Sequence, residues 1–67
     1  MIDRISYCDR EGNIGAVEFI DTETGESVWD YYNAPQYSDS KEKIEEFERR
    51  YEEQERKKYN VSKNVSL

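Results

Sequence analysis

The side chains that could carry out chemistry in this 67-residue chain are carboxylates, tyrosines and one thiol. The sequence has 16 acidic residues, six tyrosines, a single cysteine, Cys8, and no histidine. Without histidine a nucleophile has no imidazole base, and one cysteine forms neither an internal disulfide nor a zinc site. We expect Cys8 to be a small side chain in a strand.

One pair of carboxylates is a candidate for acid–base catalysis. Glu18 and Asp30 are expected to be neighbours on an open sheet face. A shallow face on so small a domain does not enclose them, so nothing would separate their pKa values. The sequence therefore predicts that the protein is not an enzyme and has no catalytic residues.

A second group of carboxylates is a candidate for cation binding. Asp21, Glu23 and Glu26 are closely spaced oxygen ligands. A calcium-binding loop counted from Asp21 needs Gly at position 6 and Glu at position 12, but Gly25 stands at position 5 and Tyr32 at position 12. We expect no metal and no cofactor.

Three strand-like segments must position these side chains. Residues 2–8, 14–20 and 27–33 are rich in β-branched and aromatic residues. The turns between them begin with Asp9 and Asp21 and contain Gly12 and Gly25, a pattern typical of short hairpins. The segments are therefore predicted to form an antiparallel β-meander.

A long helical pattern follows Pro35, which ends the third segment because proline has no N–H for the sheet. The helix is expected over residues 39–59, with Asp39 as a candidate N-cap and an apolar stripe formed by Ile44, Phe47 and Tyr51. The predicted fold class is α+β: a three-stranded antiparallel β-meander followed by one long C-terminal α-helix packed on one sheet face (β-β-β-α). Residues 1–60 are expected to form a single domain, and residues 61–67 are expected to form a polar C-terminal tail.

Alternation along the strands predicts two sheet faces. The core face is expected to carry Ile5, Tyr7, Val17, Phe19, Trp29 and Tyr31. The other face then holds a mixture of polar and apolar side chains: Ile2, Arg4, Ser6, Cys8, Ile14, Ala16, Glu18, Ile20, Val28, Asp30 and Tyr32. This second face is too apolar for an ordinary solvated surface.

Helix length predicts an overhang. Twenty-one helical residues rise about 31 Å, whereas seven-residue strands span about 23 Å. The helix should extend past the sheet, and its basic end at Arg56, Lys57 and Lys58 should lie near the turn that begins at Asp21.

Charge is unevenly distributed along the chain. Residues 1–40 hold nine acidic and two basic side chains, whereas residues 41–67 hold seven acidic and eight basic ones, for a net charge of −6. A basic face, which nucleic-acid binding needs, is missing from the strands. We expect a basic protein partner rather than direct binding of nucleic acid. The residues predicted to bind it are Asp9, Glu11, Glu18, Asp30, Tyr32 and Tyr37.

In composition the chain resembles the small acidic inhibitors of phages and other mobile elements, such as anti-restriction or anti-CRISPR proteins and nucleic-acid mimics. The resemblance implies that the chain inhibits or sequesters a nuclease or another nucleic-acid-binding protein. It assigns no residue roles, because no motif carries it. The alternative is a structural module that forms a homodimer by burying Ile2, Ile14, Ile20, Val28 and Tyr32 across a two-fold axis.

The sequence also bears on location. No stretch approaches the roughly 18 apolar residues of a membrane span. The first residues, Met-Ile-Asp-Arg, lack the pattern of a signal peptide. We expect a cytoplasmic protein, in the host cytoplasm if the chain is phage-encoded, with no contact to a membrane.

Overall fold

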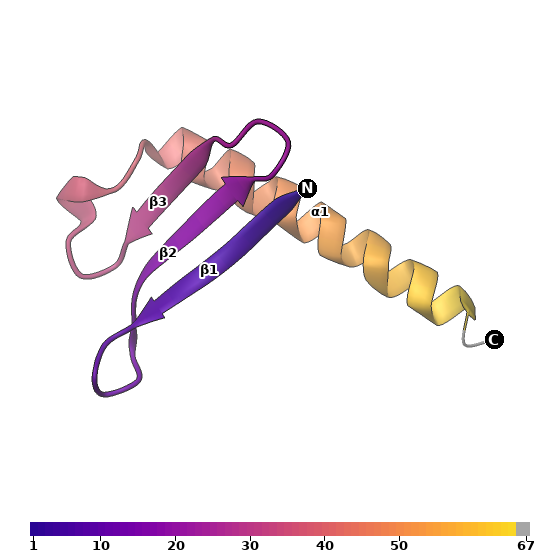
Figure 1. Ribbon diagram of the computed structural model, residues 1–67, viewed down its shortest axis with the longest axis horizontal. Coiled ribbons are helices and arrows are strands. Elements are labelled where there is room, and N and C mark those ends of the chain that lie inside the picture. Colours follow the sequence, from indigo (N-terminus) through magenta and orange to yellow (C-terminus); the bar gives the residue numbers. More distant parts are fainter. Residues whose placement is uncertain (66–67) are drawn as a thin grey trace.

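Three strands and one long helix build the fold. The computed structural model describes the backbone of residues 1–65 and the side chains of residues 1–58. The strands β1 (Ile2–Cys8), β2 (Ile14–Asp21) and β3 (Ser27–Tyr31) form one antiparallel sheet in the order β1-β2-β3. A short 3-10 helix, η1 (Pro35–Tyr37), leads to the helix α1 (Lys41–Val65), which crosses one face of the sheet (Figure 1). The predicted β-β-β-α order is confirmed.

Both hairpin turns follow the chemistry predicted from their residues. The side chains of Asp9 and Asp21 each accept the main-chain N–H two positions later, at 2.9 and 3.0 Å. Gly12 and Gly25 have φ angles of 87° and 79°. Residues with a Cβ are strained in that left-handed region, so these two glycines allow the turns to close.

The register of the sheet decides which side chains share a face. Phe19 pairs with Val28, whereas Glu18 pairs with Trp29 on one side and with Ile5 on the other. Paired residues of antiparallel strands point to the same face. The predicted core face is therefore correct for β2 but wrong for β1 and β3, which are offset by one residue: Ile5, Tyr7, Trp29 and Tyr31 lie on the face opposite Val17 and Phe19.

The core lies between α1 and the sheet. Its buried members are Ile2, Val17, Phe19, Val28 and Phe47, with Ile44 and Tyr51 packed against them. The predicted apolar stripe of the helix is thus confirmed. The prediction that Ile2 and Val28 lie on the open face is wrong, because both are buried beneath α1 and are not available to an interface on that face.

The helix begins at Lys41, and Ser40 rather than Asp39 caps it. The Ser40 Oγ accepts the N–H of Lys43 at 3.3 Å, which satisfies one of the free donors in the first turn. The helix reaches Val65, past the predicted end at residue 59. The predicted tail 61–67 is therefore helical in its backbone up to Val65, and the last two residues lie outside the described part.

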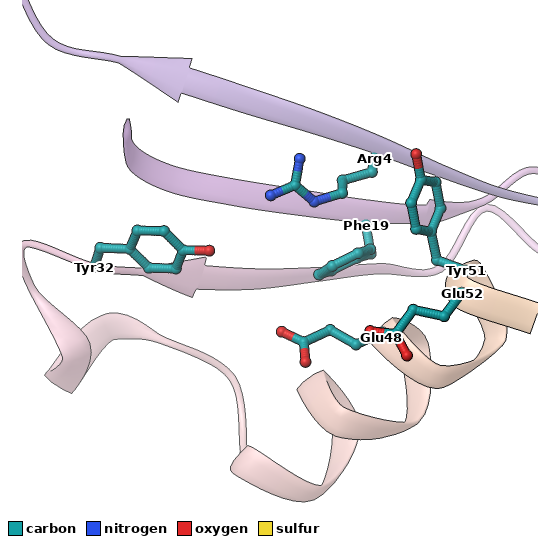
Figure 2. Close-up of a pocket in the computed structure, with 6 residues that line it drawn as sticks. All are labelled: Arg4, Phe19, Tyr32, Glu48, Tyr51 and Glu52. Carbon is teal, nitrogen blue, oxygen red and sulfur yellow. The ribbon is translucent and has the colours of Figure 1, made fainter. Parts of the chain in front are cut away.

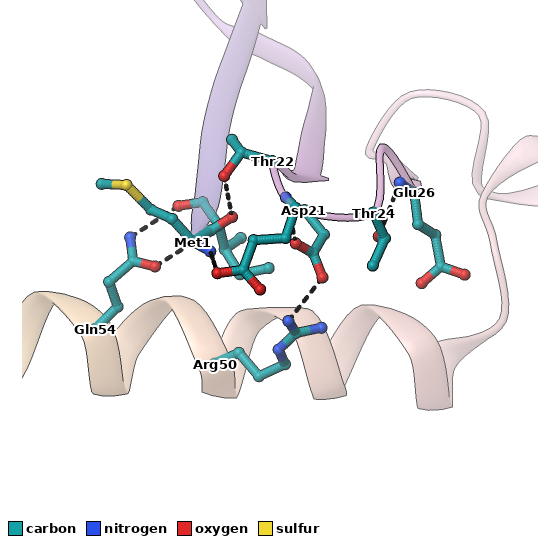
Figure 3. A network of polar contacts seen from close by, with 9 residues as sticks. Met1, Asp21, Thr22, Thr24, Glu26, Arg50 and Gln54 are labelled. Carbon is teal, nitrogen blue, oxygen red and sulfur yellow. Dashed lines mark hydrogen bonds and ion pairs between the residues drawn. The ribbon is translucent and has the colours of Figure 1, made fainter.

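Two side chains of α1 fix the helix on the sheet (Figure 3). Arg50 donates to the Oδ2 of Asp21 at 2.9 Å. The Gln54 amide accepts the N–H of Ile2 at 2.7 Å and donates to the Ile2 carbonyl at 2.9 Å. The cation beside the second turn is thus Arg50, from the middle of α1. The sequence predicted the basic helix end at Arg56 there instead. The difference arises because α1 crosses the sheet and does not run along it.

Candidate functional site

The sheet face away from α1 carries a stacked aromatic cluster. We call this surface the aromatic face and define it by Ile5, Tyr7, Glu18, Trp29 and Tyr31. The ring centroids of Tyr7 and Trp29 lie 5.3 Å apart, and those of Trp29 and Tyr31 lie 5.4 Å apart with nearly parallel planes at 11°. Ala16 stands opposite both Tyr7 and Tyr31 in the register, so a small side chain leaves room for the rings above β2.

This face remains partly open to solvent. Ile5 is 39% exposed and Tyr7 is 43% exposed, while Trp29 and Tyr31 are half-buried. Contiguous exposed apolar surface is unusual on a protein that acts alone, and aromatic side chains are enriched at protein interfaces. The aromatic face is therefore the best candidate for a binding surface.

The strand residues of this face add only negative charge. Glu18 lies at the centre, where its Oε1 accepts a hydrogen bond from the Tyr7 hydroxyl at 2.9 Å. That bond holds the proton on the phenol and raises the pKa of Tyr7 above its ordinary value. Asp3 shares the face by alternation with Ile5, whereas Arg4, the one strand cation, lies on the helix side opposite Phe19.

Of the six residues predicted to bind a partner, Glu18 is the one that the register places on the aromatic face. Asp9 and Glu11 lie in the turn after β1, where the Asp9 side chain accepts the Glu11 N–H. Tyr37 is in η1 and is 72% exposed.

The other two predicted residues lie on the helix side of the sheet. Asp30 pairs with Val17, a core residue, whereas Glu18 pairs with Trp29. The prediction that Glu18 and Asp30 are neighbours on the open face is therefore wrong, and the pair is not available for shared acid–base work. Tyr32 follows β3 and lines a groove beside α1.

The predicted site omitted Tyr7, Trp29 and Tyr31, because their large apolar rings favoured a core assignment. A signal for the correct face lay in the second turn. The Asp21 N–H bonds to the Glu26 carbonyl at 2.8 Å. Moving three residues away from the turn along each strand places Trp29 opposite Glu18. The length of the turn between Asp21 and Glu26 therefore sets the register of β2 and β3.

A groove of about 300 Å³ lies between α1 and the helix side of the sheet (Figure 2). Its lining consists of Arg4, Phe19, Tyr32, Glu48, Tyr51 and Glu52. Partial burial, and then the nearby carboxylates of Asp30, Glu52 and Glu45, raise the pKa of Glu48. The helix side of this groove is therefore acidic.

Neither surface has the ligand set of a metal centre. In residues 1–58, where side chains are described, no three acidic or cysteine side chains converge as ligands. The described part of α1 also lacks an apolar stretch long enough to cross a bilayer. The groove could take a charged or aromatic group, and the aromatic face could take a protein surface.

Comparison with protein-family models, curated proteins and solved structures found no match to this chain.

Proposed function

We propose that this chain is a non-enzymatic binding protein that holds a basic protein surface against its aromatic face and thereby inhibits or sequesters that protein. The observation that carries the proposal is the stacked series Tyr7, Trp29 and Tyr31 around the carboxylate of Glu18. Rigid aromatic side chains supply contact area at low entropic cost and are the commonest energetic centres of interfaces. The carboxylate adds a charge preference for a basic partner.

Charge distinguishes a protein partner from a nucleic acid. Stacked aromatics on a sheet also suit unpaired bases, but single-strand binding needs a positively charged groove that follows the phosphates. Here the charged strand residues of the face, Asp3 and Glu18, are acidic, and the chain carries a net charge of −6. Phosphates would be repelled, whereas the lysines and arginines of a basic protein would be attracted.

The partner class that fits this chemistry is a nucleic-acid-binding protein, for example a nuclease. Its basic surface normally receives phosphates, and carboxylates placed there would occupy it instead. Asp9 and Glu11, in the turn directly after β1, would extend the acidic surface. The composition resembles small acidic inhibitors of phages and mobile elements, and such an inhibitor would act in the cytoplasm.

The experiment compares variants of the face with a matched variant outside it. Wild-type protein, Trp29→Ala, Glu18→Lys and Tyr37→Ala are immobilised, incubated with extract of the native cells and eluted with a salt gradient. The bound protein is then purified, and its affinity for each variant is measured by calorimetry at low and high salt. We expect Glu18→Lys to weaken binding by on the order of tenfold or more, and Tyr37→Ala to leave it unchanged.

Two results would contradict the proposal. If Trp29→Ala and Glu18→Lys bind the purified partner as wild type does, the aromatic face is not the interface. If the only protein recovered is a second copy of this chain, the function is self-association, as in the alternative interpretation of the sequence.

A further inference from the structure

The two edges of the sheet differ in their hydrogen bonding. On the outer edge of β3, the N–H of Trp29 donates to the Asp39 carboxylate at 2.7 Å, and its carbonyl accepts the Asp39 N–H at 2.9 Å. The N–H of Tyr31 donates to the Ser38 Oγ at 2.7 Å. The segment after η1 therefore occupies the main-chain hydrogen-bonding groups on this edge of β3, and the edge is protected from pairing with another strand.

Among the residues with described side chains, one residue bonds the main chain on the outer edge of β1, and it does so at the start of the strand. Gln54 bonds both main-chain groups of Ile2, so these groups point away from β2. Main-chain direction alternates along a strand, which means that Arg4 and Ser6 also point outward. Within residues 1–58 no side chain bonds the main-chain N–H or C=O of either residue, and the one contact recorded there joins their side chains. Four strong hydrogen-bonding groups thus line an open edge.

The helix continues beyond this edge. Gln54 marks the point where α1 passes β1, and residues 55–65 remain helical after it. Eleven residues extend about 16 Å, which is roughly three times the spacing of neighbouring strands. In Figure 1 this part of α1 projects past the N-terminal end of β1 with no strand in front of it.

The projecting helix and the groove carry opposite net charge, even when Glu55 in the helix and Arg4 in the groove are counted. Arg56, Lys57 and Lys58 are exposed just after Gln54. Glu48 and Glu52 line the groove on the helix side of the sheet. Within one molecule both sets are on α1, so the groove receives no cation from the projecting helix of its own chain.

We propose that a second copy of this chain pairs with the open edge, β1 against β1 in antiparallel orientation, to form a continuous six-stranded sheet. The two-fold axis passes beside Ile5, because this register pairs Arg4 of each copy with Ser6 of the other. It uses all four free main-chain groups of each chain and places no like charges directly opposite one another. A register that sets Arg4 against Arg4 would oppose two cations.

The same symmetry explains why the helix is longer than the sheet. Each α1 crosses the Ile2 end of its own β1, and in an antiparallel pair that end lies beside the Cys8 end of the second strand. The projecting basic residues of one copy then extend toward the acidic groove side of the other copy, which offsets part of the repulsion between two acidic chains. The proposal is independent of the proposed function, since Glu18, Trp29 and Tyr31 of the aromatic face lie on β2 and β3, away from the paired edge.

Proline at position 6 tests the edge. The Ser6 N–H points away from β2, so Ser6→Pro removes an edge donor without breaking a hydrogen bond of the β1–β2 ladder. Ser6→Ala is the matched control, because it removes the hydroxyl and retains the N–H. Sedimentation velocity over 5–500 µM should give a dimer for wild type and Ser6→Ala, and at least a roughly tenfold higher Kd for Ser6→Pro. Circular dichroism checks that each variant is folded.

A cysteine scan tests the register and does not depend on how the proline variant folds. In a Cys8→Ser background, Ile5→Cys places two thiols opposite each other at a non-hydrogen-bonded position, where Cα atoms are about 4.5 Å apart. Mild oxidation should yield a disulfide-linked dimer. Thr24→Cys, exposed in the second turn, is the control for random collision and should remain monomeric.

Three outcomes would overturn the proposal. The first is a wild-type chain that stays monomeric up to 500 µM. The second is a dimer whose Kd is the same for the folded Ser6→Pro variant and for Ser6→Ala, or a dimer that is lost in the Trp29→Ala variant alone. The third is equal cross-linking at positions 5 and 24.

Discussion

Replacing Phe19 tests the assignment of the two sheet faces most directly. Phe19 is 3% exposed, and its ring meets Tyr51 edge-on with centroids 6.2 Å apart. Truncating a buried phenylalanine to alanine costs about 3–5 kcal/mol, through lost transfer free energy and the cavity that remains. A domain of this length has a free energy of unfolding of about 3–10 kcal/mol. Phe19→Ala should therefore remove at least about a third of the stability, and all of it if the domain is near the lower end of that range.

The comparison is with Trp29, a larger ring on the opposite face. Trp29 is half-buried and takes part in two stacked pairs, each contributing about 0.5–1.5 kcal/mol beyond burial. We expect Trp29→Ala to cost about 1–3 kcal/mol, less than Phe19→Ala. If Trp29 were in the core, as its large apolar ring predicts, Trp29→Ala would cost at least as much as Phe19→Ala.

Urea denaturation followed by far-ultraviolet circular dichroism measures both variants, because this signal does not depend on the tryptophan. With a slope near 1 kcal/mol per molar urea for so small a domain, the midpoint should fall by several molar for Phe19→Ala. Phe19→Leu, which retains an apolar side chain, should cost about 1–1.5 kcal/mol and keep the transition measurable. A larger loss for Trp29→Ala than for Phe19→Ala would refute the face assignment.

Three further predictions concern polar groups of α1 and the second turn. The hydrogen bond from Arg50 holds the pKa of Asp21 below its usual 3.8. The stability that the ionised Asp21 contributes is therefore present above pH 3.8 and is lost as the pH falls through the folded-state pKa. Asp21→Asn should lower stability at pH 7 and flatten the acid limb of a curve of melting temperature against pH. Gln54→Glu keeps an acceptor for the Ile2 N–H but loses the donor to the Ile2 carbonyl, and should destabilise more than Gln54→Ala, which we expect to cost about 1–2 kcal/mol in urea unfolding. Burial and neighbouring carboxylates raise the pKa of Glu48, so Glu48→Gln should raise the melting temperature at pH 7, and an unchanged or lower value would contradict the acidic character of the groove.

The proposed dimer would give the aromatic face a second role in recognition. Two copies joined at β1 would present two aromatic faces on one side of a continuous sheet. A partner with repeated basic surface could then bind both, which increases the effective affinity without new contacts. A partner that binds one face would be unaffected by Ser6→Pro, so the stoichiometry measured by calorimetry separates these cases.

Local features were predictable because they depend on residues close together in the sequence. The turn at Asp9 to Gly12 and the turn at Asp21 to Gly25 follow from an aspartate that bonds its own backbone and a glycine at positive φ. The helix stripe follows from spacing, and Phe47 is buried as expected. The order of the three strands and the long helix was therefore determined by the sequence alone.

The face of each strand was decided by pairing between distant residues. Apolar side chains occur on both faces of β1, with Ile2 on one and Ile5 on the other, so alternation alone does not say which is buried. A shift of one residue in the register exchanges the faces, and the observed pairing buries Val28 while it leaves Trp29 on the open side.

The polar side chains that close the sheet edges also depend on tertiary structure. Asp39 was a plausible helix cap by position, yet it bonds the edge of β3, and Gln54 had no evident role until the helix crossed β1. Short-range chemistry thus set the elements of this protein. Which aromatic rings form a binding surface, and which edge stays open, was decided by strand register and by the path of α1, because both depend on contacts between segments far apart in the chain.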